Sequence, residues 1–201
     1  MNRILLLFLM GLASCKVVHN PLHDEVSRMV HGDPAADVSY IYALPYPEGK
    51  TYRVVQGYYS WFTHRDRAAL DFNMQRGSEI TAAREGVVIR VKEDGDKGGL
   101  NKKYRAFGNN IVIQHNDGSR AGYWHLQKNG ALVNMGDTVR RGQRIGLSGE
   151  TGYAAFPHLH FLVWKNGGKG NWQTVATRFQ TTSGVRYLKF LGKYKNGPSI
   201  K

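Results

Sequence analysis

Short apolar segments, in which apolar and polar residues tend to alternate, recur along the chain from residue 39 onward. This period of two is typical of strands that bury one face. Turn signals separate the segments, and no long amphipathic helical pattern follows Pro34. The pattern therefore predicts an all-β, antiparallel single domain. The turn signals are Glu48-Gly49, Asp117-Gly118, Asn129-Gly130, Arg141-Gly142 and Asn166-Gly167-Gly168.

One predicted strand, residues 156–164, carries two histidines in an apolar and aromatic context. Because side chains alternate along a strand, His158 and His160 are expected on one face, with Leu159 and Phe161 on the other. Two imidazoles on a buried face are costly unless each finds a partner, and a metal ion with its water supplies one. We interpret His158 and His160 as metal-binding or catalytic residues.

A second predicted strand, residues 119–126, follows a turn and contains His125. Its alternation predicts that Tyr123 and His125 share a face while Trp124 points away. Taken alone, His125 is more typical of a structural histidine. His115, at a strand end before the turn, is interpreted as structural.

Further upstream, His64 and Asp71 complete a possible ligand set. Asp71 lies within the apolar run 68–72, and a carboxylate in such a run is rarely buried unless it is paired or binds a cation. Asp71 is therefore the stronger candidate of the two. A hydrolytic Zn²⁺ needs three protein ligands and one position left open for water, which these imidazole and carboxylate groups can provide.

The N-terminus has the pattern of an export signal. A short positive start containing Arg3 precedes an apolar run, Ile4 to Ala13, that is too short to span a bilayer. The run ends in Leu12-Ala13-Ser14-Cys15, which resembles a bacterial lipobox and predicts lipidation at Cys15. A plain secretory signal is the alternative. Cys15 is the only cysteine, so an intrachain disulfide is excluded.

Residues 15–38 are predicted to form a tether between the lipid anchor and the folded domain. A short amphipathic helix is expected after Asn20-Pro21, with Gly32 as its stop. The histidines of this segment, His19, His23 and His31, are interpreted as solvated residues rather than as a metal-binding tract.

The chain is strongly basic, with a formal net charge of +13 at pH 7. Such a charge favours anionic partners, such as the carboxylates of peptidoglycan or other wall polymers. Nucleic acid is the usual alternative, but an export signal argues against a nucleic-acid partner. The predicted localisation is the bacterial cell envelope, anchored by lipid at a membrane. Lys16 after Cys15 favours the outer membrane.

In their order and amino-acid sequence, the segments resemble those of the M23 metallopeptidases, also called LytM or lysostaphin-like peptidases. The resemblance is collinear from Thr63 to Phe161. It rests on Thr63-His64, Ala69-Leu70-Asp71-Phe72, Gly77 to Ala83, Gly86-Val87-Val88, Gly108 to Gly118, Tyr123-Trp124-His125-Leu126, Gly136 to Gly146, Ser148 to Gly152, and His158-Leu159-His160-Phe161.

The resemblance implies the M23 peptidase fold and a division of labour among five residues. His64, Asp71 and His160 would hold one Zn²⁺ per chain, while His125 and His158 would line the catalytic water without binding metal. One departure concerns the first two ligands. Many members have three residues between them, whereas six residues separate His64 from Asp71 here, so His64 is the ligand with the weakest sequence support.

These residues predict a zinc-dependent endopeptidase that hydrolyses peptide bonds in peptidoglycan, either in cross-links or in stem peptides. A zinc ion lowers the pKa of its water towards 7, and His125 and His158 suit acid and base work. Two alternatives stay open: a catalytically silent LytM-fold lipoprotein that activates a cell-wall amidase, and a wall-binding anchor module. The sequence leaves the oligomeric state and the cross-link undefined.

The predicted organisation has four parts: a signal peptide over 1–14, the tether over 15–38, the peptidase domain over 39–184, and a terminal strand and tail over 185–201. Within the domain, the stretch from Lys92 to Lys103 is expected to be a flexible loop beside the substrate groove. The Tyr-rich stretch from Tyr40 to Trp61 is expected either in the groove wall or in the core.

Overall fold

The computed structural model describes residue 31 and residues 39–168 and 170–198. The predicted export signal, Cys15 and the tether helix lie outside the described residues, apart from His31. In the described part of the chain, no helix is both long and apolar enough to cross a bilayer.

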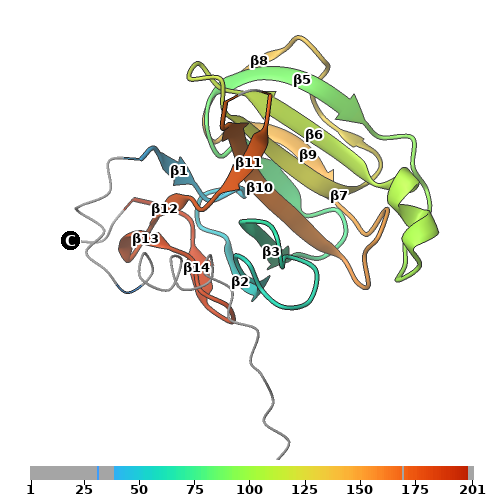
Figure 1. The fold of residues 1–201 in the computed structure, drawn as a ribbon, viewed down its shortest axis with the longest axis horizontal. Helices are drawn as coiled ribbons and strands as arrows, with labels where there is room; N and C mark the ends of the chain where they lie inside the picture. Colours follow the sequence, from blue (N-terminus) through green and yellow to red (C-terminus); the bar gives the residue numbers. More distant parts are fainter. Residues whose placement is uncertain (1–30, 32–38, 169, 199–201) are drawn as a thin grey trace, which may run out of the picture.

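The main body is an antiparallel sheet of 11 strands, which confirms the predicted fold class (Figure 1). Strand β11 adds to β10, and β9 connects β7 to β4. The path through the sheet is β14 (Lys193–Lys195), β2 (Thr51–Gln56), β3 (Ala69–Asn73), β10 (His158–Asn166), β7 (Arg120–Ala131), β6 (Asn109–Gln114), β5 (Gly86–Lys92) and β8 (Thr138–Val139), with β11 (Trp172–Val175), β9 (Arg144–Ser148) and β4 (Glu79–Thr81) off this path.

A smaller sheet of three strands packs beside it and consists of β1 (Ile41–Ala43), β12 (Arg178–Thr181) and β13 (Gly184–Tyr187). Where a terminal strand and tail were predicted over residues 185–201, the structure has two short strands in place of one. Two strands, β13 and β14, belong to different sheets, because the chain reverses between them at Leu191, whose φ is 63°. A bond from the Gly192 N–H to the Lys189 carbonyl closes this turn.

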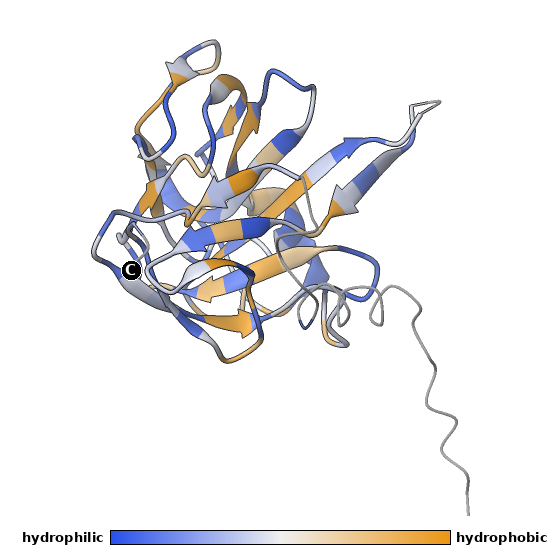
Figure 2. Ribbon diagram, turned by 90° about the vertical axis from the view of Figure 1, so that its left-hand side faces the viewer, coloured by the Kyte–Doolittle hydropathy of each residue, from blue (hydrophilic) through white to orange (hydrophobic). Residues whose placement is uncertain are grey.

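The core lies on one face of β3, β10 and β7, as the alternation predicted. Leu159 and Phe161 of β10 are buried there, and Phe161 stands opposite Tyr123 of β7. Apolar and polar bands alternate along the strands (Figure 2). Within the Tyr-rich stretch the tyrosines Tyr42, Tyr46 and Tyr58 belong to the core, whereas Trp61 is 77% exposed.

One predicted turn is absent. Strand β7 runs through Asn129-Gly130, and its register against β9 shifts between Leu126 and Ala131. Asn129 adopts a left-handed φ of 53°, a conformation that asparagine adopts more readily than most residues. The signal therefore marks an irregularity inside a long strand.

Candidate metal centre

Asp71 and His160 face each other across two neighbouring strands. They are a cross-strand pair in the antiparallel register of β3 and β10, so their side chains leave the same face of the sheet. The His160 Nδ1 lies 2.8 Å from the Asp71 Oδ1. Asp71 is buried without any lysine or arginine partner among the described residues.

His64 joins this pair from the loop between β2 and β3. Its Nε2 lies 3.3 Å from the Asp71 Oδ1 and 3.2 Å from the His160 Nδ1. In the described part of the chain, these three residues form a group whose ligand atoms all lie within 4.8 Å of one another. The structure thus brings together the three residues predicted as ligands.

The separations match the needs of a small divalent ion. Four ligands at the Zn–N distance of about 2.0 to 2.1 Å form a tetrahedron with edges of about 3.3 Å. The three separations here run from 2.8 to 3.3 Å. Two imidazoles and one carboxylate also form a donor set that zinc accepts, with a fourth position open. The residues present therefore fit the expected zinc ion.

The long spacing between His64 and Asp71 is accommodated by the loop. The Tyr59 N–H donates to the Arg67 carbonyl, and the Arg67 N–H donates to the His64 carbonyl, each at 3.0 Å. The loop therefore folds back on itself and returns to β3. His64 is fully buried, and its Nδ1–H donates to the Gly57 carbonyl at 3.0 Å. This bond leaves Nε2 available for a metal.

His158 and His125 lie beside the three potential ligands. The Nδ1–H of His158 donates to the Phe156 carbonyl at 2.8 Å, and its Nε2 lies 3.9 Å from the Asp71 Oδ1. The Nδ1–H of His125 donates to the Thr151 carbonyl at 2.7 Å. The two rings lie 4.6 Å apart between centroids. In each ring the backbone bond fixes the proton on Nδ1 and leaves Nε2 as an acceptor.

The prediction that Tyr123 and His125 share a face is wrong. Tyr123 points into the core, whereas Trp124 and His125 both contact His160, with centroid separations of 6.0 and 5.8 Å. The cause is a β-bulge: Leu126 pairs with Asn109 and Trp124 with the next residue of β6, so His125 is the extra residue. Its φ of 66° rotates its side chain to the metal-centre face.

Burial and neighbouring charges shift the titration of this cluster. Burial alone would raise the pKa of the Asp71 carboxyl, but His160 and His64 outweigh it and hold the pKa well below the usual value. The pKa of His125 is lowered to about 3, mainly by burial and in smaller part by the nearby His158 and His160, against the opposing effects of the Thr151 carbonyl and Asp71. The pKa of His160 is lowered mainly by burial, against the pull of Asp71. His125 is therefore neutral at pH 7.

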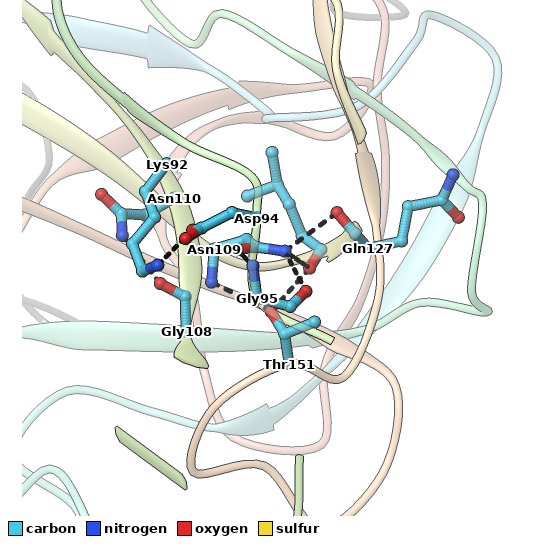
Figure 3. A network of polar contacts seen from close by, with 9 residues as sticks. Lys92, Asp94, Gly95, Gly108, Asn109, Asn110, Gln127 and Thr151 are labelled. Atoms are coloured by element: carbon cyan, nitrogen blue, oxygen red, sulfur yellow. Dashed lines mark hydrogen bonds and ion pairs between the residues drawn. The ribbon is translucent and has the colours of Figure 1, made fainter. Parts of the chain in front are cut away.

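A polar network fixes the segment that orients His125 (Figure 3). The Thr151 hydroxyl donates to the Leu126 carbonyl at 2.7 Å and accepts from the Asn109 N–H at 3.0 Å. Asn109 is fully buried, and its side chain also bonds both backbone groups of Gly95 at 2.8 Å. Sequence reasoning missed Asn109 and Thr151 as supports, because only three-dimensional contacts connect them with His125.

Two tryptophans extend the metal-centre face along the sheet, and sequence reasoning missed this as well. The Trp124 ring lies 5.7 Å from that of Trp164 and 6.0 Å from that of His160. A Cβ on Gly122 would lie 1.8 Å from the Trp124 ring. Gly122 is therefore required for the Trp124 indole to lie over the backbone. This glycine was the signal in the sequence that could have predicted the arrangement.

The remaining histidine considered on a strand, His115, lies outside the cluster. Its Nδ1–H donates to the Glu85 carbonyl at 2.7 Å, and its ring contacts Tyr42. The candidate lipidation residue Cys15 lies outside the described residues, so the structure does not place it.

Comparison with known proteins agrees with this geometry. The profile of Peptidase family M23 matches residues 56–172. An uncharacterized metalloprotease of Buchnera aphidicola is 34% identical over 155 residues, which cover 74% of this chain and 37% of that protein. Peptidoglycan DD-endopeptidase ShyA of Vibrio cholerae is 42% identical over 91 residues, covering 45% of this chain and 18% of that protein.

Among solved structures, the M23 metalloprotease pseudoalterin aligns with 82% of this chain and 100% of its own, with a TM-score of 0.50 and 20% identity. That likeness concerns the fold alone. The match spans well under half the length of the two curated relatives, the Buchnera aphidicola protein and ShyA. The family profile covers more than half of this chain, including all five residues of the cluster, and the chain therefore belongs to peptidase family M23.

Proposed function

We propose that this protein is a zinc-dependent endopeptidase that hydrolyses peptide bonds in peptidoglycan, in cross-links or stem peptides. The observation that carries the proposal is the convergence of His64, Asp71 and His160 within 4.8 Å, flanked by two further histidines with free Nε2 atoms. A structural metal site would need no such flanking pair.

His64 would bind the ion through Nε2, His160 through Nδ1 and Asp71 through a carboxylate oxygen. When bound, zinc supplies Lewis-acid chemistry that polarises the scissile carbonyl and acidifies water at neutral pH. With Zn²⁺ bound, one carboxylate and two neutral imidazoles would leave the centre with a net positive charge. This charge would stabilise the negative charge that develops on the carbonyl oxygen during peptide hydrolysis.

His125 and His158 would handle the protons. Each keeps its proton on Nδ1, held by a backbone carbonyl, and so presents a basic Nε2. Because the pKa of His125 is lowered to about 3, this residue is neutral at the start of the reaction. It can orient the attacking water. One of the two residues would accept at its Nε2 the proton that this water loses, and would deliver that proton to the nitrogen of the leaving amine as the peptide bond breaks.

The choice of substrate class rests on relatives and on charge. ShyA is named a peptidoglycan DD-endopeptidase, and a glycyl-glycine endopeptidase of Staphylococcus capitis is 37% identical over 103 residues, which cover 51% of this chain and 25% of that protein. The basic chain suits an anionic wall. We further propose that Cys15 carries a lipid anchor that holds the enzyme at a membrane of the envelope, with the outer membrane favoured.

The test is a digestion of purified peptidoglycan by the full chain, with bound metal measured in parallel. The proposal predicts about one equivalent of zinc, release of new amino termini, and loss of activity on chelation with recovery on added zinc. Metal-free protein that releases no peptides but stimulates a separate amidase would overturn it and establish the silent activator. Binding to the wall without either activity would indicate an anchor module.

A further inference from the structure

The segment between β5 and β6 carries a second feature beside the metal centre. It contains the short 3-10 helix η2 (Lys102–Phe107), which lies next to the start of β6 in Figure 1. The sequence predicted a flexible loop from Lys92 to Lys103. The structure shows a segment that is tied at its base by Asn109, whose side chain bonds Gly95 (Figure 3).

Backbone contacts attach this segment to the loop that orients His125. Gly98 pairs with Gly152, and the Gly152 N–H donates to the Lys97 carbonyl at 2.8 Å. A Cβ on Gly98 would lie 1.8 Å from the Glu150 carbonyl oxygen, so the close approach requires glycine there. The position of the segment relative to the metal centre is therefore fixed by several independent contacts.

A pocket of about 360 Å³ opens in this segment and is lined by Lys97, Lys103, Tyr104 and Phe107. The Lys97 Nζ lies 5.2 Å from the centroid of the Phe107 ring, and the Lys103 Nζ lies 5.2 Å from that of Tyr104. The pocket thus combines two ammonium groups with two aromatic walls. Both lysines are exposed, so the pocket is a surface hollow rather than an enclosed cavity.

The acidic residues of the segment do not neutralise these lysines. Asp94 pairs with Lys92, and Asp96 lies 3.7 Å from the Nζ of Lys128. The Glu93 carboxylate accepts a hydrogen bond from the backbone of Ala131. In the described part of the chain, neither pocket lysine has a carboxylate partner. The pocket is therefore positively charged and suited to an anion.

The segment that carries the pocket contacts the loop that orients His125. Gly152 touches the segment on one side, and on the other a Cβ built on it would lie 3.6 Å from the His125 Nδ1. Paired backbones lie about 4.8 Å apart, and an extended peptide advances about 3.3 Å per residue. An extended peptide that runs from His125 over Gly152 would meet this segment on the order of two to four residues from the scissile bond.

We propose that this pocket, defined by Lys97, Lys103, Tyr104 and Phe107, binds a free carboxylate on the peptide being cleaved. The inference rests on the proposed function and narrows its substrate class to cross-links flanked by anionic stem residues rather than uncharged glycine bridges. The lysines would form charge-assisted hydrogen bonds with the carboxylate, and the aromatic rings would pack against the aliphatic part of the same residue.

The test uses two synthetic cross-linked peptides that differ only in whether this carboxylate is free or amidated. The measured quantity is the ratio of kcat/KM for the free form to that for the amidated form. We expect the wild-type full chain to favour the free form by about 10-fold or more, mainly through KM, since tenfold corresponds to about 1.4 kcal/mol. The preference should weaken at high salt.

The double variant Lys97→Gln/Lys103→Gln should bring this ratio close to one, and Lys97→Arg/Lys103→Arg should restore most of it. Lys50→Gln is the matched control, because Lys50 is exposed and precedes β2 near the β14 edge of the sheet. A ratio near one in the wild type, or an unchanged ratio in the Gln variant, overturns the pocket as a carboxylate site.

A binding measurement separates this inference from the proposed function. Non-cross-linked stem peptides, free and amidated, are titrated into the zinc-loaded full chain and followed by calorimetry. Preferential binding of the free form that is lost in the Gln variant supports the pocket, even if no peptide is ever cleaved. Cleavage without this preference keeps the function and overturns the pocket. Tighter binding of a glycerol-phosphate polymer than of the free stem peptide also overturns it.

Discussion

Two histidines on the β6–β7 hairpin, the buried His115 and the half-buried His125, look alike when each is considered alone. The Nδ1–H of His115 donates to the Glu85 carbonyl, and that of His125 donates to the Thr151 carbonyl, both at 2.7 Å. In both cases burial is the main cause of a lowered pKa. Burial, orientation and an available Nε2 therefore do not by themselves distinguish a catalytic histidine.

What differs is the surroundings of each Nε2. The His125 ring lies 4.6 Å from His158 and 5.8 Å from His160. The His115 ring instead lies 5.8 Å from that of Tyr42, and its Nε2 is buried without a hydrogen-bond partner among the described residues. The chemistry proposed for His125 thus depends on the neighbouring His158 and His160, whereas His115 only packs against Tyr42.

The largest effect is expected from a change in the metal centre, which lies beside His125 and not beside His115. Asp71→Ala should abolish zinc binding, because it removes the one anionic ligand of the cluster. Loss of the Lewis acid should lower kcat/KM by about 10³- to 10⁵-fold, corresponding to several kcal/mol of transition-state stabilisation. Metal analysis and peptide-release kinetics provide the measurements. Full zinc occupancy in this variant would contradict the proposed ligand set.

The next test compares the two histidines directly. His125→Ala should lower kcat by about 10²- to 10⁴-fold, the usual contribution of a general acid or base, while zinc stays bound. His115→Ala is the matched control and should retain kcat/KM within about twofold. Steady-state kinetics at saturating zinc decide the matter. Equal losses in the two variants would show that the difference in surroundings has no functional consequence.

Strand periodicity is a local signal and predicted the sheet, whereas the choice of His64, Asp71 and His160 as ligands came from the resemblance to the M23 family. The alternation around Leu159 and Phe161 gave the buried face of β10 and therefore the common direction of His158 and His160. The loop that returns His64 to Asp71 was not predictable from spacing, since its shape depends on bonds to Gly57 and between loop residues.

The side-chain direction of His125 was mispredicted for a related reason. A β-bulge shifts the register by one residue, and alternation rules cannot anticipate it without knowledge of the partner strand. Likewise, the contact of Gly98 with Gly152 and the network around Asn109 join distant parts of the chain. Residues that support the candidate site through such contacts carry no motif of their own.

A smaller effect is expected on stability. His115→Ala should lower the free energy of unfolding by about 1 to 3 kcal/mol, because it leaves the Glu85 carbonyl without its hydrogen bond and removes packing against Tyr42. Urea denaturation followed by tryptophan fluorescence measures the change. An unaltered midpoint would mean that His115 does not stabilise the fold, and it would contradict the structural role assigned to His115.

The smallest expected effect is the pH dependence of that stability. Burial lowers the pKa of His115, with Arg84 adding to the effect and the Glu85 carbonyl, Asp117 and the Glu85 carboxylate opposing it. The folded state therefore stays unprotonated at a pH where the unfolded histidine, with its pKa near 6.5, already binds a proton. The stabilising contribution of neutral His115 is fully present above about pH 6.5.

As the pH falls below that value, this contribution declines towards the lowered pKa of the folded state, with a slope of at most about 1.4 kcal/mol per pH unit. The difference in unfolding free energy between wild type and His115→Ala should therefore shrink from pH 7.5 to pH 5. Both proteins contain the same metal centre, so its titration cancels in the difference. A difference that grows on acidification would mean that native His115 binds protons more readily than the unfolded chain, and its place as the neutral, packed counterpart of His125 would be lost.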